Sequence, residues 1–369
     1  MTETEINQIG PERNRTLTEE TPDMMGNRNH AWQLARTPPE GWPTDGDFRW
    51  TEGDIPEPGP GQAVGETLLL SLDPYQWNRR RNGTEQPGEV CHGRTVSRII
   101  SSKHTTFREG DIIFNTQGWQ QYGLTGEGIT DFGYMTPRLL DGNKGPYSYA
   151  LGALGMLGLT AYAGLIVQCQ PQAGETVVVS AASGGVGQLV GQLARIYGAR
   201  VVGIAGTQEK VAYCQKTLGF DACISHKDPS FREQLANACP DGCDVYFENV
   251  GGPVFDAVCD LLNSNARISL CGMIAHYGED IAASRARWFE KAAPLRESRG
   301  LEVHPLFVGD FVASHQAQFL EEMGDYVRSG RVVYKEDRVK GLAEAPHAFR
   351  AMLAGSNFGK TLVEVQPGF

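Results

Sequence analysis

The clearest pattern of hydrophobic and polar positions lies between Gly174 and Lys210. Residues 176–180 form an apolar, β-branched run, which is typical of a buried parallel strand. Glycines follow at once, and apolar side chains then recur at helical spacing, at Val190, Leu193 and Ile196. Gly198 predicts the end of that helix, and residues 201–204 predict the next strand. The stretch therefore reads as strand, glycine turn, helix and strand.

A β-rich pattern, punctuated by proline and glycine, runs from Trp32 to Tyr149. Strands are predicted there over residues 65–72, 94–101 and 110–114. From Gly155 to Arg331 strand and helix patterns alternate, which indicates a parallel doubly wound sheet. Within that part we predict strands over residues 244–247 and 267–271, with a helix over residues 253–262 between them.

The tail changes character again, with a predicted helix over residues 342–354 and a last strand over residues 359–365. Such a strand can return to the N-terminal β-rich part, which would make the alternating part an insertion. We therefore predict an α/β fold with two domains: a β-rich substrate domain of residues 29–154 and 334–369, and a dinucleotide-binding domain of residues 155–333. Residues 1–28 carry few apolar side chains, and we expect a polar arm that is mobile or ordered against a partner subunit.

The glycine turn directly after the strand of residues 176–180 is where a dinucleotide pyrophosphate binds in such a unit. The tight turn lets the backbone approach the pyrophosphate, and the helix N-terminus supplies free N–H groups and a positive dipole end. The residues predicted to face the pyrophosphate are Gly184, Gly185, Val186 and Gly187.

The end of the second strand indicates which dinucleotide binds. A site for NAD usually carries Asp or Glu about 20 residues past the glycines, to hold the ribose 2′-hydroxyl. Here residues 204–207 read Ile-Ala-Gly-Thr, without a carboxylate, and Lys210 follows one helical turn later. A missing acid and a nearby cation favour a 2′-phosphate, so NADPH is predicted over NADH. The alternative is that Lys210 is a solvated helix residue.

Composition excludes several other classes of function. The 369 residues carry a formal net charge of −11, which argues against binding to nucleic acid or to an anionic membrane surface. No apolar run reaches the roughly 18 residues of a membrane span, and the acidic, polar start is unlike a signal peptide, so a cytoplasmic location is expected. The eight cysteines are scattered, and Cys239 and Cys243 have poor zinc spacing, so we expect reduced thiols and no metal site.

Several strings occur together in an order that is similar to a known family. They are LSLDPY at 70–75, GWQQY at 118–122, LGMLGLTAY at 154–162, the run at 173–187, FENVGG at 247–252, CGMIAHY at 271–277 and NFGK at 357–360. The chain resembles the medium-chain dehydrogenase/reductase superfamily, in its zinc-independent branch of NADPH-dependent double-bond reductases. That branch includes prostaglandin reductases, plant alkenal reductases and bacterial curcumin reductases. The resemblance implies a Rossmann domain beside a GroES-like β-rich domain, NADPH as cofactor, and a homodimer.

The resemblance also implies further cofactor contacts. They are His226 near the 2′-phosphate, Asn249 on the ribose side, the loop residues Cys271 and Gly272, the backbone of Phe307 and Val308 at the nicotinamide amide, and Asn357 closing over the cofactor. For His226 the alternative is an ordinary surface histidine. For the two asparagines it is the capping of turns, which Asn does well.

The activity implied is reduction of the C=C bond of an α,β-unsaturated ketone or aldehyde, with hydride added to the β-carbon and a proton to the α-carbon. By resemblance, Tyr277 is the first candidate for the hydroxyl that polarises the substrate or supplies the proton, and Tyr75 is the second. The alternatives are that Tyr277 packs the domain interface and that Tyr75 only shapes the pocket.

The chain departs from the family where substrate would sit. Gln76, Trp77 and Asn78 replace a Met-Arg-Gly-like stretch, Arg94 and Leu157 replace smaller or different residues, and residues 123–149 diverge. These changes favour a larger or more polar substrate, or they are packing changes. Two other functions therefore stay open: a pathway-specific NADPH reductase of an imine, a quinone or another polarised double bond, and a non-catalytic NADPH-binding protein.

Overall fold

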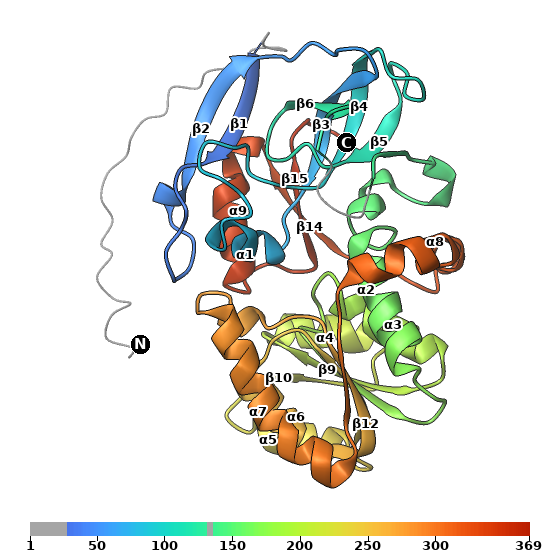
Figure 1. Cartoon of the computed structure of the whole chain (residues 1–369). Coiled ribbons are helices and arrows are strands. Elements are labelled where there is room, and N and C mark those ends of the chain that lie inside the picture. Colours follow the sequence, from blue (N-terminus) through green and yellow to red (C-terminus); the bar gives the residue numbers. More distant parts are fainter. Residues whose placement is uncertain (1–27, 131–135) are drawn as a thin grey trace.

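The computed structural model describes residues 28–130 and 136–369, so the predicted N-terminal arm lies outside the described residues except for Arg28. Figure 1 shows two lobes, a β-rich one above and an α/β one below, with α8 (Val312–Arg328) at the level between them. The chain crosses from the upper to the lower lobe through α2 (Met156–Ala161) and the π-helical segment Tyr162–Cys169.

The lower lobe is built on a six-stranded parallel sheet. Its strands, in spatial order, are β10 (Ala222–Ser225), β9 (Arg200–Ala205), β8 (Thr176–Ser180), β11 (Cys243–Glu248), β12 (Leu262–Leu270) and β13 (Glu302–Pro305). The order moves outward on both sides from β8, which is the order of a dinucleotide-binding doubly wound sheet. The predicted fold class is confirmed for this lobe.

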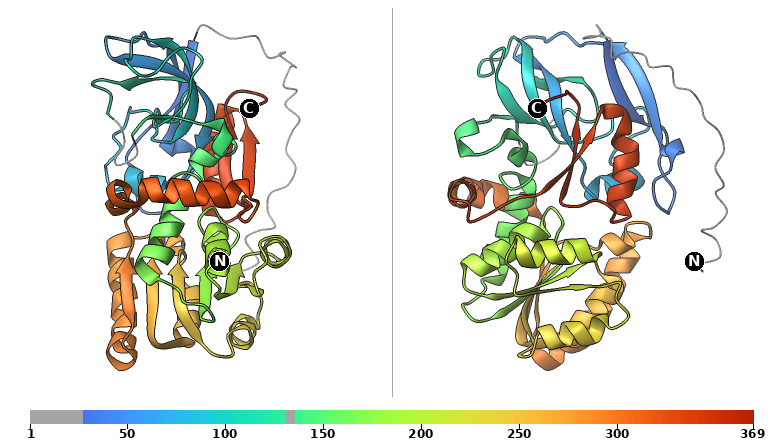
Figure 2. Two further views of the ribbon diagram at one scale, coloured as in Figure 1. Left: turned by 90° about the vertical axis from the view of Figure 1, so that its right-hand side faces the viewer. Right: turned by 180° about the vertical axis from the view of Figure 1, so that it is seen from behind.

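Helices cover both faces of this sheet, as the right-hand view of Figure 2 shows. They are α3 (Gly187–Ile196), α4 (Gln208–Lys216), α5 (Phe231–Ala238), α6 (Gly252–Cys259) and α7 (Ile281–Arg299). The β-branched run of β8 explains why both faces need cover, because successive side chains point to opposite faces. Val177 and Val179 lie in the core cluster that includes α3, whereas Val178 lies in the one that includes α5 and α6.

The upper lobe contains a seven-stranded, mostly antiparallel sheet and a separate hairpin. The sheet holds β14 (Glu336–Lys340), β15 (Lys360–Glu364), β3 (Gln62–Ser71), β4 (Thr95–Ser102), β5 (Ile112–Asn115), β7 (Arg138–Leu139) and β6 (Tyr122–Gly126). The hairpin is β1 (Arg28–Leu34) with β2 (Phe48–Asp54). The lobe also contains the α-helices α1 (Tyr75–Arg81) and α9 (Ala345–Leu353). The last strand, β15, pairs antiparallel with β3, so the segments before and after the lower lobe share one sheet.

Two predicted bounds in the lower lobe are wrong in detail. The helix predicted over residues 253–262 ends at Cys259, and β12 already begins at Leu262 rather than at residue 267. A turn that the Leu261 N–H closes on the Val258 carbonyl stops the helix. The polar residues 263–265 hid the start of the strand, because its exposed end lacks the apolar pattern of a buried parallel strand. The domain boundaries themselves stay a prediction.

A buried cation forms part of the core of the upper lobe. The Arg80 guanidinium is fully buried and lies 4.5 to 5.3 Å from the ring centres of Trp119, Phe349 and Phe48. Its carboxylate partner, Glu85, is 1% exposed, and the Arg80 Nε to Glu85 Oε2 distance is 3.2 Å. Burial raises the pKa of Glu85, although Arg80 opposes that rise.

We expect Glu85→Ala to lower the free energy of unfolding by about 3 kcal/mol, because it leaves the buried Arg80 without its counter-charge. The matched control is Asp260→Ala, which removes the carboxylate of an exposed pair with Arg232 and should cost less than about 1 kcal/mol. Urea denaturation measures both. Equal losses in the two variants would show that the Arg80 pair is no more important to stability than a surface pair.

Candidate functional site

A cavity of about 560 Å³ is lined by residues of both lobes. The residues proposed from the sequence all line it: Tyr75, Gly184, Gly185, Val186, Gly187, Lys210, His226, Asn249, Cys271, Gly272, Tyr277, Phe307, Val308 and Asn357. The structure therefore brings these residues together from segments up to 282 positions apart, while the role of each stays a prediction. The apolar majority of the lining suits an aromatic or conjugated ligand.

The glycine turn forms one wall of the cavity at the N-terminus of α3. Here the backbone doubles back sharply, with Ala181 at a positive φ of 49° and the Gly184 N–H donating to the Ala181 carbonyl. A Cβ added to Gly187 would lie 2.3 Å from that same carbonyl oxygen, so the turn has no room for a side chain there. The Tyr334 hydroxyl donates to the Gly185 carbonyl and holds the turn from the upper lobe.

Cationic side chains gather at the end of the cavity beyond β9. The Thr207 side chain caps the start of α4, and Lys210, in its first turn, donates from Nζ to the Gly355 carbonyl at 2.7 Å. Burial, and then the neighbouring charge of Lys227, lower the pKa of Lys210. Burial, Lys227 and Lys210 likewise lower the pKa of His226. Lys210 lines the cavity and the positive charge of Lys227 acts on it, so this end of the cavity favours an anion.

Sequence reasoning missed Lys227 in this group, although it directly follows His226. No local signal separates it from an ordinary exposed lysine. Its place beside Lys210 follows only from the packing of α4 against β10, which brings the two segments together.

The two asparagines line the cavity but also have structural partners. Asn249 donates from its backbone N–H to the Ser180 hydroxyl and from Nδ2 to the Ser180 carbonyl, both at 2.8 Å. It therefore joins the ends of β8 and β11. Asn357 donates from Nδ2 to the Gly359 carbonyl at 2.9 Å. Structural contacts therefore use one amide N–H of each asparagine, and a cofactor contact would use the second N–H or the amide oxygen.

Tyr277 lies on a short loop after β12 that is fixed from two sides. Its N–H donates to the Ile274 carbonyl, and its own carbonyl accepts from Arg81 of the upper lobe at 2.7 Å. Burial raises the pKa of Tyr277 to about 12, so the hydroxyl keeps its proton at neutral pH. Tyr277 can therefore act as a hydrogen-bond donor in the cavity.

Tyr75 follows a loop that a buried ion pair holds in place. Lys360 of β15 donates from Nζ to the Leu72 carbonyl at 2.6 Å and to Asp73 Oδ1 at 2.9 Å. The Ser71 hydroxyl donates to the other oxygen of Asp73. Burial acts to raise the pKa of Asp73, but Lys360 and then Arg94 outweigh it and hold the pKa below its ordinary value. The carboxylate is therefore ionised, and the loop that begins α1 is rigidly placed.

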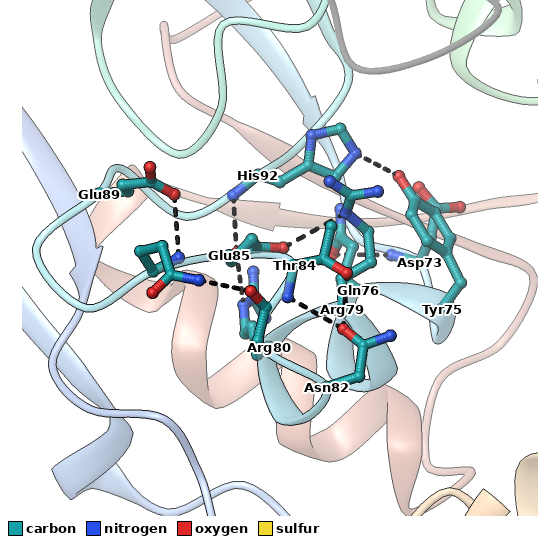
Figure 3. Close-up of polar contacts among 12 residues, drawn as sticks. Asp73, Tyr75, Gln76, Arg79, Arg80, Asn82, Thr84, Glu85, Glu89 and His92 are labelled. Carbon is teal, nitrogen blue, oxygen red and sulfur yellow. Dashed lines mark hydrogen bonds and ion pairs between the residues drawn. The ribbon is translucent and has the colours of Figure 1, made fainter. Parts of the chain in front are cut away.

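The hydroxyl of Tyr75 meets a buried histidine (Figure 3). The Tyr75 Oη to His92 Nε2 distance is 2.6 Å, and His92 is 2% exposed. The His92 backbone N–H donates to Glu85, the partner of Arg80, so the histidine is anchored to the core of the upper lobe. The sequence predicted no role for His92, because its contact with Tyr75 is tertiary.

Trp42 also lines the cavity, although no pattern in the sequence predicted it. Its ring is 46% exposed, and it lies against Gly278, where an added Cβ would be 3.0 Å from the indole. The Gly41 N–H donates to the Gly278 carbonyl at 2.7 Å, so this loop of the upper lobe closes on the loop that carries Tyr277.

The residues present fit a phosphorylated dinucleotide. The glycine turn at a helix N-terminus suits a pyrophosphate, Lys210 beyond β9 suits a 2′-phosphate, and residues 204–207 contain no carboxylate that would repel it.

Within residues 28–130 and 136–369 no three His, Cys, Asp or Glu side chains are grouped so that they could hold a metal ion. In the same residues no helix is both long and apolar enough to cross a membrane.

Comparisons with known proteins agree with this geometry. Residues 30–130 match the family described as N-terminal domain of oxidoreductase, and residues 185–300 match that described as zinc-binding dehydrogenase. The chain is 40% identical to the NADPH-dependent curcumin reductase of Escherichia coli (strain K12), over 92% of this chain and 97% of that protein. The chain belongs to the medium-chain dehydrogenase/reductase superfamily.

Two further members of this superfamily are similar over most of the chain. The 2-alkenal reductase (NADP(+)-dependent) of Nicotiana tabacum is 36% identical, over 84% of this chain and 89% of that protein. The crystal structure of CurA in complex with NADPH from Vibrio vulnificus superposes with a TM-score of 0.82 at 40% identity, covering 91% of this chain and 99% of that one. The predicted Rossmann and GroES-like fold and the predicted family are confirmed.

We expect Gly187→Ala to lower the free energy of unfolding by about 1–3 kcal/mol, because its Cβ would meet a backbone oxygen that cannot move aside. Gly185→Ala is the matched control in the same turn. Its Cβ would meet the flexible end of Leu157 at 2.4 Å, so a smaller loss is expected. Thermal denaturation of both variants without cofactor is the measurement, and an undisturbed Gly187→Ala protein would contradict the described turn.

Proposed function

We propose that this NADP-dependent oxidoreductase reduces the C=C bond of an α,β-unsaturated ketone or aldehyde. NADPH as cofactor and the enzyme class are confirmed by the family relationships. The observation that supports the finer proposal is that Tyr75 and Tyr277 line the same cavity as the glycine turn and Lys210. The relative named 2-alkenal reductase supports it.

The reduced nicotinamide, when bound, supplies a hydride to the β-carbon. The residues of the chain bind the cofactor and exclude water. The glycine turn and Lys210 bind the phosphates, and the apolar lining of the cavity keeps water out. Negative charge that develops on the substrate carbonyl oxygen is stabilised by a protonated tyrosine hydroxyl. Tyr277 suits this part, because burial raises its pKa to about 12 and it stays a donor throughout.

Two alternatives share the same cofactor site. A pathway-specific reductase of an imine or a quinone would use the same hydride donor, and a non-catalytic protein would only bind NADPH. The predicted homodimer also stays a prediction.

Reduction with NADPH deuterated at the transferred position separates these functions. The proposal expects turnover of a simple enone with the deuterium on the β-carbon of the saturated product. Deuterium on the carbonyl carbon, or turnover of imines or quinones alone, would contradict it. A purified protein that binds NADPH but oxidises none of it with any acceptor would support the non-catalytic alternative.

We expect Lys210→Ala to weaken NADPH binding about 10- to 100-fold, because it removes a charge-assisted hydrogen bond to the 2′-phosphate. Binding of NADH, which lacks that phosphate, should hardly change. Lys216→Ala is the matched control, since it removes the same charge from the exposed last turn of α4. Titration calorimetry measures all four affinities for the two variants, and equal losses for both dinucleotides would contradict the assignment.

A further inference from the structure

The contact between Tyr75 and His92 bears on which tyrosine supplies the proton. Tyr75 lines the cavity, and its hydroxyl lies 2.6 Å from Nε2 of His92. In Figure 3 the His92 ring points at the Tyr75 hydroxyl from the loop that precedes β4. A histidine in this place can either accept the phenolic proton or donate its own N–H to the phenolic oxygen.

His92 is a neutral imidazole. Burial lowers its pKa well below the ordinary value, and the charges of Arg94, Arg79 and Arg80 lower it further. A neutral ring carries one N–H, so its tautomer decides the direction of the bond to Tyr75. The ring is also anchored, because the His92 backbone N–H donates to the buried Glu85.

A buried cation lies over the ring of Tyr75. The Arg94 guanidinium is 4.9 Å from the centre of that ring, is 4% exposed, and also pairs with the Asp73 carboxylate at 3.5 Å. A cation in a buried place stabilises a nearby anion more than it would in water. Tyr277 differs, because burial raises its pKa to about 12 and makes loss of its proton costly.

We propose that His92 is a positioning residue that donates its Nε2–H to the Tyr75 oxygen, so that Tyr75 gives its phenolic proton to the α-carbon of the substrate. The inference rests on the proposed C=C reduction. After hydride has reached the β-carbon, the Tyr75 O–H bond breaks and the C–H bond at the α-carbon forms. The phenolate left behind accepts the His92 N–H and faces Arg94, and it regains a proton from water. Tyr277 keeps its proton and binds the carbonyl oxygen.

The tautomer of His92 is a direct test that needs no turnover. Nitrogen NMR of protein labelled with ¹⁵N-histidine distinguishes a protonated Nε2 from a protonated Nδ1, and His92→Gln assigns the resonances. The proposal expects the proton on Nε2. A proton on Nδ1 would mean that His92 accepts from Tyr75, and it would overturn the proposal.

A double-mutant cycle tests whether His92 acts through Tyr75. Tyr75→Phe should lower kcat about 100-fold, within the usual range for loss of a general acid. His92→Leu should lower kcat at least about 10-fold with little change in KM, and His92→Gln, which keeps an N–H donor, should recover most of the rate. Because His92 acts only through the hydroxyl, Tyr75→Phe/His92→Leu should be no slower than Tyr75→Phe alone.

Losses that multiply in the double variant would show that His92 is merely structural, and would overturn the inference. His347→Leu, at an exposed histidine of α9, is the matched control and should keep the wild-type rate. If the wild-type protein reduces no enone, the proposed function fails, whereas the NMR measurement still decides the tautomer of His92. The two failures are therefore distinguishable.

Discussion

The buried ion pair between Lys360 and Asp73 is the interaction on which the site depends. It joins the last strand of the chain to the loop that leads into α1, and both side chains are almost fully buried. Burial lowers the pKa of Lys360 although Asp73 opposes this, as expected for a pair that loses its hydration on burial. Such a pair contributes little net stability, and we interpret it as a device that fixes position. It holds the loop that carries Tyr75 against β15, beside the cavity.

From this anchor the two lobes have separate tasks. The lower lobe supplies the features proposed to bind the dinucleotide. These are a sheet whose strand order creates a crevice, a glycine turn at a helix N-terminus, and Lys210 beyond β9. The upper lobe supplies side chains on the proposed substrate side of the cavity. They are Tyr75, which contacts His92 and Arg94, and Trp42, whose loop meets Gly278. The contacts that join the two lobes include those from Lys210 to Gly355, from Arg81 to Tyr277, from Gly41 to Gly278 and from Tyr334 to Gly185.

The sequence predicted the parts of the site that depend on local pattern. The strand of residues 176–180 and the glycines after it are recognisable because a buried parallel strand and a tight turn each demand particular residues. Tyr75, Tyr277 and the two asparagines were predicted from the resemblance to the family, and in the structure all of them line the cavity. Lys227, His92 and Trp42 could not be predicted in this way, since each matters only through a neighbour distant in sequence. The start of β12 was missed for the opposite reason, because its polar residues lack the local pattern of the strand that they form.

A crystal structure of the protein with NADP⁺ and an enone is the most direct test of the account. The account expects the 2′-phosphate within hydrogen-bond distance of Lys210 Nζ, the enone carbonyl oxygen on the Tyr277 hydroxyl, and the α-carbon next to Tyr75. A dinucleotide bound with its 2′-phosphate away from Lys210, or an enone whose reacting carbons lie out of reach of both tyrosines, would contradict it.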